Sequence, residues 1–259
     1  MTTVADAIAR ANSERHGALI GYLPLGFPDI DTSVEAAIAL VNAGVDVLEL
    51  GLPYSDPVMD GPVIQAATVE ALAKGFRVRD AFDAVRRIHA ATGTPVLIMS
   101  YWNLILQYGV DAFARELAEA GGAGLITPDL IPDEAGEWIA ASEQHGLERV
   151  FLAAPTSSAD RLTLMTEQSR GFVYTVSTMG TTGAREDVDE AARGLVARLR
   201  VAGCTSACVG IGISTPAQVR DVLEYADGAI VGSALVRALA EGGIPALTDL
   251  AQNLAEGTR

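Results

Sequence analysis

Two carboxylates eleven residues apart are the side chains of this sequence best suited to acid and base chemistry. Glu49 lies in the apolar run 47–50, which predicts a buried strand. Burial raises the pKa of a carboxyl group and suits it to donating and accepting protons near neutral pH. Asp60 lies in the Pro- and Gly-containing loop that follows, where we expect it to stay ionised. Two carboxylates in contrasting surroundings allow one site to carry out both acid and base catalysis.

Each carboxylate also has a purely structural interpretation when it is taken alone. Glu49 could be a strand-end residue held by a neighbouring barrel residue, and Asp60 could form a turn before Gly61. The two together at this spacing favour the catalytic interpretation.

Glycines after the last three apolar segments predict a phosphate site. They lie in the runs 180–183, 210–214 and 232–234. Glycine lets backbone N–H groups approach an anion closely, and Gly232 and Ser233 open a short predicted helix whose N-terminal dipole favours negative charge. One such run is weak evidence, but three in the last three loops of a barrel indicate phosphate binding. Residues 178–187, rich in glycine, threonine and charge, have the composition of a lid.

Short apolar segments alternate with helical segments along the whole chain. Strands are predicted at 18–22, 45–50, 95–100, 124–127, 150–154, 172–177, 206–210 and 229–231. Helices are predicted at 32–43, 78–91, 110–120, 133–143, 159–169, 188–201, 216–224 and 246–254. This alternation implies parallel strands joined by right-handed crossovers, and eight such units favour a closed (β/α)8 TIM barrel over an open, doubly wound sheet.

The barrel is expected to form a single domain of residues 1–259 with two additions. An amphipathic helix within residues 1–17 precedes the first strand, and an extra helix at 63–73 follows the second. Active sites of such barrels lie at the carboxyl ends of the strands. Glu49 and the glycine runs are therefore expected at the same end.

Composition limits the class of protein and its partners. The hydrophobic content of 49% with 20% charged residues predicts a large buried core. A net charge of −15 argues against nucleic acid or an anionic membrane surface as a partner. Residues 1–17 lack the apolar run of a signal peptide, and Cys204 and Cys208 are expected to be core thiols in a reducing compartment. We therefore expect a cytoplasmic protein without a membrane span.

The positions of lysine and histidine argue against several other mechanisms. The single lysine, Lys74, falls at the end of the extra helix, which disfavours a Schiff-base aldolase or a pyridoxal phosphate linkage in this chain. His16, His89 and His145 are scattered and are expected to be solvated helix residues rather than metal ligands. The mechanism that remains is acid–base catalysis by carboxylates on a small phosphorylated substrate.

Several motifs make the chain resemble the alpha subunits of tryptophan synthase over nearly its whole length. They are YLPLG at 22–26, ELGLPYSDP at 49–57, DGP at 60–62, TPD at 127–129, GIGIS at 210–214 and GSA at 232–234. The resemblance implies cleavage of indole-3-glycerol phosphate to indole and D-glyceraldehyde 3-phosphate, with no cofactor or metal in this chain. It also implies an alpha2beta2 heterotetramer in which indole passes to a beta subunit that carries pyridoxal phosphate.

The resemblance further implies roles for individual residues. Glu49 would protonate carbon 3 of the indole ring and then take the proton of the glycerol hydroxyl. Asp60 would accept a hydrogen bond from the indole N–H and offset the positive charge that develops there. The other implied substrate contacts are Tyr22 and Tyr174 at the indole, Thr182 in the closing loop, and Gly183, Gly212, Gly232 and Ser233 at the phosphate.

Three other interpretations remain open from the sequence. The chain could be a stand-alone indole-3-glycerol-phosphate lyase. It could be another phosphate-binding barrel, such as an isomerase, although that interpretation does not explain Glu49 together with Asp60. It could also be a barrel that binds a phosphate ligand only to regulate a partner, which the presence of both carboxylates disfavours.

Overall fold

The predicted strands form one closed parallel barrel in the computed structural model, which describes residues 2–176, 185–210 and 212–259, with side chains left out for 185–189. Each strand pairs with the next along the chain, and β8 pairs with β1 to close the ring. The strands are β1 (Ala18–Pro24), β2 (Val47–Gly51), β3 (Val96–Met99), β4 (Gly124–Thr127), β5 (Glu148–Ala153), β6 (Val173–Val176), β7 (Ala207–Gly210) and β8 (Gly228–Val231). The TIM barrel prediction is confirmed, and the open sheet is excluded.

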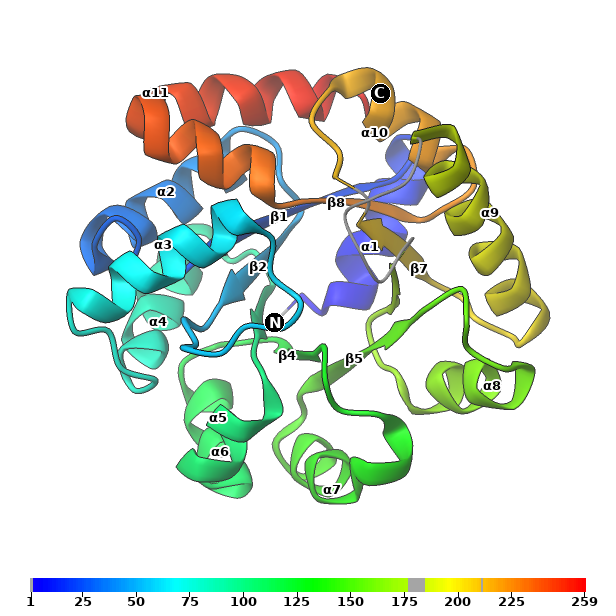
Figure 1. Ribbon diagram of the computed structural model, residues 1–259, viewed down its shortest axis with the longest axis horizontal. Coiled ribbons are helices and arrows are strands. Elements are labelled where there is room, and N and C mark those ends of the chain that lie inside the picture. The colour runs from blue at the N-terminus through cyan, green and yellow to red at the C-terminus, as the bar shows by residue number, and fades with distance from the viewer. Residues whose placement is uncertain (1, 177–184, 211) are drawn as a thin grey trace.

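The described helices surround the barrel as an outer ring, except for the first, which lies inside that ring (Figure 1). They are α1 (Val4–Glu14), α2 (Ile30–Asn42), α3 (Pro62–Ala73), α4 (Asp80–Thr92), α5 (Trp102–Tyr108), α6 (Val110–Glu119), α7 (Gly136–His145), α8 (Ala159–Gln168), α9 (Arg185–Val201), α10 (Pro216–Leu223) and α11 (Ser233–Glu256), with a 3-10 turn η1 (Pro132–Glu134) before α7. Every predicted helix has a counterpart, and α3 is the extra helix after the second strand. Helix α5 was not predicted.

Two of the helices differ in form from the prediction. The predicted helix at 133–143 is divided into η1 and α7, because Ala135 between them has non-helical backbone angles. The short helix predicted at Gly232 and Ser233 and the helix at 246–254 are joined in α11. They meet at Gly243, whose φ of 64° breaks the helix, and Pro245 follows it. Helix α11 therefore changes direction midway.

Local sequence explains where several helices begin. Thr3 and Asp6 form a reciprocal capping box at the start of α1, and Thr215 and Gln218 do the same for α10. The side chain of Asp29 caps α2. These side chains satisfy backbone N–H groups that the first helical turn leaves without partners.

Alternation along the strands divides the interior into two apolar layers. One layer packs the outward side of the barrel against the helices. The other fills the barrel itself with side chains such as Ile20, Val47, Leu97 and Ile126. Glu49 follows Val47 by two residues, so it faces the same interior, closer to the carboxyl end of the strands.

Helix α1 closes the amino end of the barrel. Its Val4, Ile8 and Ala11 are buried in the same cluster as the inward-facing strand residues. In Figure 1 this helix lies inside the ring formed by the others. Glu148, at the start of β5, accepts hydrogen bonds from the backbone N–H groups of Val4 at 2.6 Å and Ala5 at 3.2 Å. The first turn of α1 is thereby fixed to the barrel.

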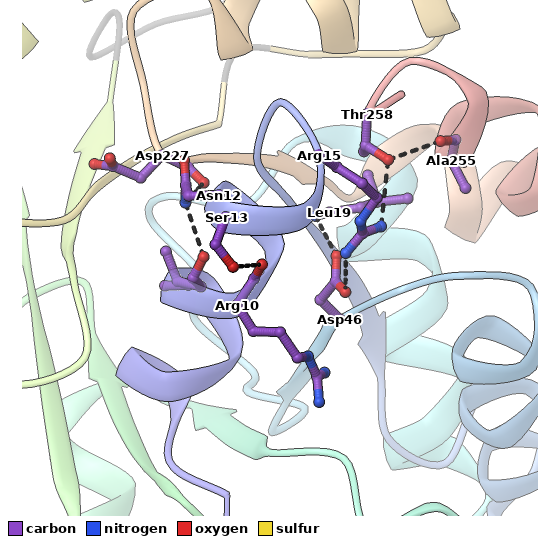
Figure 2. Close-up of polar contacts among 10 residues, drawn as sticks. Arg10, Asn12, Ser13, Arg15, Leu19, Asp46, Asp227, Ala255 and Thr258 are labelled. Atoms are coloured by element: carbon purple, nitrogen blue, oxygen red, sulfur yellow. Dashed lines mark hydrogen bonds and ion pairs between the residues drawn. The ribbon is translucent and has the colours of Figure 1, made fainter.

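A second polar cluster, the base network of Arg15, Leu19, Asp46 and Thr258, joins the two ends of the described chain (Figure 2). Arg15 Nη2 lies 2.6 Å from Asp46 Oδ1, and Asp46 Oδ2 accepts the Leu19 N–H at 2.9 Å. Arg15 Nη1 also donates to Thr258 Oγ1 at 3.3 Å, and Thr258 is fully buried. The segments before β1, before β2 and after α11 therefore meet in one hydrogen-bonded cluster.

Both cysteines are free and buried, as predicted for core thiols. Cys208 lies on β7, and Cys204 lies just before that strand. Burial raises the pKa of both thiols above their ordinary value. In the described part of the chain, no helix is long and apolar enough to cross a membrane.

Candidate active site

Glu49 lies inside the carboxyl end of the barrel. In the strand register it pairs with Tyr22 on β1 and Leu97 on β3, and it is 2% exposed. Its Oε2 atom is buried and has no hydrogen-bond partner among the described residues. Burial, and to a smaller extent the nearby Asp60, raises the pKa of Glu49 from 4.5 to about 8. At neutral pH this carboxyl group is protonated and can act as an acid.

Asp60 lies in the loop between β2 and α3 and is half-buried. Burial raises its pKa, and a hydrogen bond from Tyr101 acts in the opposite direction. The Tyr101 hydroxyl oxygen lies 3.4 Å from Asp60 Oδ1. The surroundings of Asp60 are therefore less polar than the sequence predicted. The surroundings of the two carboxyl groups still differ, because Asp60 is partly exposed and accepts a hydrogen bond from Tyr101.

Two side chains from outside the loop hold the segment that carries Asp60. The Tyr101 hydroxyl accepts the backbone N–H of Met59 at 2.8 Å. Gln65 on α3 donates from Nε2 to the carbonyl oxygens of Asp60 at 2.9 Å and Pro57 at 3.4 Å. The loop is thus anchored both to the end of β3 and to the first turns of α3.

Tyr22 and Tyr174 lie beside Glu49, from β1 and β6 respectively. Burial first, and then nearby charges that include Glu49, raise the pKa of each phenol well above its ordinary value. Both hydroxyl groups lie against glycines. A side chain at Gly51 would collide with the Tyr22 hydroxyl, and one at Gly210 would come within 2.6 Å of the Tyr174 hydroxyl. Two aromatic rings beside one carboxyl group offer apolar surface suited to contact with a planar aromatic ligand.

The glycines after β7 and β8 have the features of an anion site. Gly232 is the N-cap of α11, so the helix starts at Ser233 and directs its first N–H groups toward this end of the barrel. Gly212 has a φ of 72°, which favours glycine, and an added Cβ would meet no described atom within 4 Å. At Gly232 an added Cβ would lie 3.4 Å from the ring of Tyr22. The predicted phosphate and indole contacts therefore adjoin one another.

Thr182 and Gly183 lie outside the described residues. Of the predicted lid at 178–187, only the backbone of 185–187 is described, as the start of α9. That helix begins three residues before the predicted start at 188.

The histidines lie apart from this site and differ from the prediction in their exposure. His16 is exposed, but His89 and His145 are partly buried, and His145 Nε2 lies 2.8 Å from Asp111 Oδ1. The expectation of solvated histidines is wrong for these two, because their helices pack closely on neighbouring elements. In residues 2–176, 185–210 and 212–259, no three His, Cys, Asp or Glu side chains are grouped as metal ligands would be.

The sequence analysis missed Tyr101 and its neighbours. Tyr101 comes directly after the predicted strand 95–100, and that strand-end position could have identified it. Its ring centre lies 5.2 Å from that of Tyr54, whose hydroxyl accepts a hydrogen bond from Asn103 Nδ2 at 3.2 Å. The Trp102 N–H donates to Asp129 Oδ1 at 2.9 Å. The start of α5 therefore supports the loop that carries Asp60.

Comparison with known proteins gives consistent matches over the whole chain. The sequence model of the tryptophan synthase alpha chain family matches residues 8–257. The tryptophan synthase alpha chain of Leifsonia xyli is 66% identical over 257 residues, which cover 99% of this chain and 98% of the relative. A structure of Mycobacterium tuberculosis tryptophan synthase superposes with a TM-score of 0.94 at 52% identity, covering 100% of this chain and 99% of that one. The alpha subunit of tryptophan synthase from Legionella pneumophila matches with a TM-score of 0.91 at 33% identity, covering 100% and 98%.

Proposed function

The chain belongs to the tryptophan synthase alpha chain family, and from this premise we propose that Glu49 and Asp60 are its catalytic residues. The protein is a lyase of tryptophan biosynthesis that catalyses the alpha reaction. It cleaves indole-3-glycerol phosphate to indole and D-glyceraldehyde 3-phosphate. This is a retro-aldol reaction, and its difficulty is that carbon 3 of indole is a poor leaving group until it has been protonated.

Glu49 is suited to supply that proton. Its carboxyl group is buried, protonated at neutral pH and without a competing hydrogen-bond partner for Oε2 among the described residues. After giving its proton to carbon 3, the ionised carboxylate is the base for the glycerol hydroxyl, whose O–H bond breaks as the carbon–carbon bond breaks. One residue thus acts as acid and then as base within a single turnover.

Asp60 is suited to stabilise the intermediate. Protonation of carbon 3 places positive charge on the indole nitrogen, so a carboxylate that accepts the N–H hydrogen bond stabilises the charged species more than the substrate. The loop anchored by Tyr101 and Gln65 holds this carboxylate close enough to Glu49 to raise its pKa. Glu49 therefore delivers the proton to carbon 3, and Asp60 stabilises the positive charge that this creates on the indole nitrogen.

The remaining assignments concern substrate binding. We assign Tyr22 and Tyr174 to the indole ring, because their aromatic side chains lie beside Glu49. Gly212, Gly232 and Ser233 are assigned to the phosphate, because they provide backbone N–H groups and a helix N-terminus without bulky side chains. Thr182 and Gly183 keep the roles expected from the resemblance, in the closing loop and at the phosphate.

The observation that carries the assignment is the buried carboxyl group of Glu49, whose Oε2 has no hydrogen-bond partner among the described residues, beside a second carboxylate. The test is to mix the purified chain with indole and glyceraldehyde 3-phosphate and to measure the condensed product, and then to repeat the assay with Glu49→Gln. We expect product with the wild type and almost none with the variant. No condensation by the wild type would contradict the lyase activity, and equal condensation by both proteins would contradict only the role of Glu49.

An alpha chain of this family has a beta subunit as its partner, and we propose that the partner docks on residues 53–59. This segment exposes Val58 to 80% and Met59 to 38% next to Asp60, and exposed apolar groups beside a catalytic residue indicate a protein contact. Covering them would retain apolar indole and would order Asp60. The assembly that we propose is an alpha2beta2 heterotetramer.

The partner also accounts for the cofactor. We propose that pyridoxal phosphate belongs to the beta subunit and that this chain works without a cofactor. Lys74, the single lysine, supports this division, because its Nζ is engaged by Glu70 at 2.7 Å and by the carbonyl oxygen of Pro28 at 2.7 Å. We further propose a cytoplasmic location for this biosynthetic reaction, without nucleic acid or membrane partners.

Steady-state cleavage with and without a beta subunit tests the docking surface. We expect the partner to raise the rate of the wild type, and Asp56→Ala to reduce that stimulation more than the basal rate. Equal rates in all four measurements would favour the alternative of a stand-alone lyase.

A further inference from the structure

We propose that Tyr101 is a positioning residue for Asp60, whose hydroxyl group holds the carboxylate in the orientation that meets the indole N–H. The inference rests on the role proposed above for Asp60 in cleavage. It assigns to Tyr101 no contact with the reacting atoms. Tyr101 acts through the carboxylate and through the backbone next to it.

The hydrogen bonds of Tyr101 have a defined direction. The Met59 N–H donates to the hydroxyl oxygen at 2.8 Å, so this oxygen acts there as an acceptor. The hydroxyl proton is then free to donate to Asp60 Oδ1, 3.4 Å away. The second bond is long for a hydrogen bond between two oxygen atoms, which usually spans about 2.5–3.0 Å. One oxygen atom thus holds the backbone at Met59 and the side chain of the next residue.

Tyr101 is also fixed more firmly than the loop that it holds. It follows β3 directly, is 3% exposed and packs its ring against Tyr54. The next backbone N–H, at Trp102, is bound by Asp129 from the loop after β4. Asp60, in contrast, lies on a loop and is half-buried. The hydroxyl group therefore ties a carboxylate on a loop to a residue that is fixed to the barrel.

The charges around the pair make the hydroxyl a donor. In the part of the chain that the structure describes, the titratable groups facing Asp60 are Glu49 from β2, Tyr22 from β1 and Tyr101 itself, and Asp129 faces Tyr101 from the β4 side. Burial, and then the nearby Asp60, raises the pKa of Tyr101 to about 12, so the phenol stays protonated during catalysis. Its hydrogen bond lowers the pKa of Asp60, against the effect of burial. The same contact that orients Asp60 therefore favours its ionised form.

The test is Tyr101→Phe in the full chain, which keeps the ring and removes the hydroxyl. We expect kcat to fall by about 10- to 100-fold with little change in KM, because a misplaced group slows the chemical step more than binding. Because Asp60 loses a donor to its charged form, the acidic limb of the kcat profile should move to higher pH. The substitution removes one hydroxyl group from a loop at the end of the barrel and leaves the packing of the ring intact, so the fold should persist.

Gln65→Met provides a matched control, because Gln65 holds the same loop but donates only to carbonyl oxygens. This variant should loosen the loop without moving the acidic limb. Wild-type kcat in Tyr101→Phe, a rise in KM alone, or the same displacement of the limb in both variants would each overturn the inference. Failure of the function itself would look different, because the wild type would then not cleave the substrate or Asp60→Asn would retain full activity.

Discussion

Carboxylates at the two ends of this barrel differ in the hydrogen-bond donors that they have. At the amino end, Asp46 binds Arg15 at 2.6 Å and a backbone N–H at 2.9 Å, and Asp227 binds Arg200 at 2.6 Å and a backbone N–H at 2.7 Å. At the carboxyl end, Glu49 has a buried oxygen without a described partner, and the Asp60 carboxylate accepts a single long hydrogen bond from the described residues, that of Tyr101 at 3.4 Å.

The difference shows how one fold separates stability from chemistry. A carboxylate that accepts hydrogen bonds from two strong donors helps to hold the elements of the fold together. A buried carboxyl group without donors is costly to ionise, so its proton remains available for transfer. The base network stabilises the closed barrel, while the opposite end holds the carboxyl group that we propose as the acid and base of the reaction.

The largest effect is expected from Glu49→Gln. The amide can neither protonate carbon 3 nor accept the hydroxyl proton, so cleavage should fall by at least ~10²–10⁴-fold while substrate still binds. Steady-state cleavage of indole-3-glycerol phosphate measures this, with Glu35→Gln on the exposed side of α2 as the control. More than a tenth of the wild-type rate in Glu49→Gln would remove the acid–base role from this residue.

The pH dependence of the wild type tests the same group without a mutation. Glu49 must be protonated to act as an acid, and its pKa is raised to about 8, so kcat/KM should decline as pH rises through about 8. A value of kcat/KM that stays constant to well above that pH would contradict the protonated state that we assign to Glu49.

Asp60→Asn should have the next largest effect. The amide keeps the shape but loses the charge that offsets the positive indole nitrogen, so kcat should fall by about 10²–10³-fold with little change in KM. Separate determination of kcat and KM checks this prediction. A large rise in KM with an unchanged kcat would make Asp60 a binding residue only.

Gly232→Asp should affect binding rather than chemistry. It places a carboxylate and a Cβ where the start of α11 is assigned to the phosphate, so the affinity for glycerol phosphate should fall markedly. Titration with glycerol phosphate measures the loss, and binding of indole alone should survive. Unchanged affinity would separate this helix from the phosphate site.

The smallest effect on catalysis is expected at the amino end. Asp46→Asn weakens the base network, so the free energy of unfolding should drop by about 1–3 kcal/mol, with unchanged kcat per folded molecule. Thermal unfolding checks this, and Asp31→Asn is the control, because its ion pair with Arg87 is exposed and such pairs contribute about 0–1 kcal/mol. A lower kcat in Asp46→Asn would contradict the assignment of stability to the amino end and catalysis to the carboxyl end.

The sequence predicted the barrel well because its strands are buried on both sides and read as apolar runs. The same reasoning placed Glu49 correctly, since a charged residue within such a run is conspicuous. Helix α5 was missed because it has only seven residues and no side-chain cap. The role of Tyr101 depends on a loop 41 residues earlier in the chain reaching the end of β3, which no local pattern encodes.

The buried thiols have a practical consequence for spectroscopy. Cys204 is 6% exposed, Cys208 is fully buried, and burial raises the pKa of both, so neither should react readily with alkylating dyes in the folded chain. They are the only cysteines in the sequence. A cysteine introduced at Val58, which is 80% exposed, would therefore accept a single fluorophore without prior removal of the native ones. A change in its emission on adding a beta subunit would test whether the partner docks on residues 53–59, as we propose.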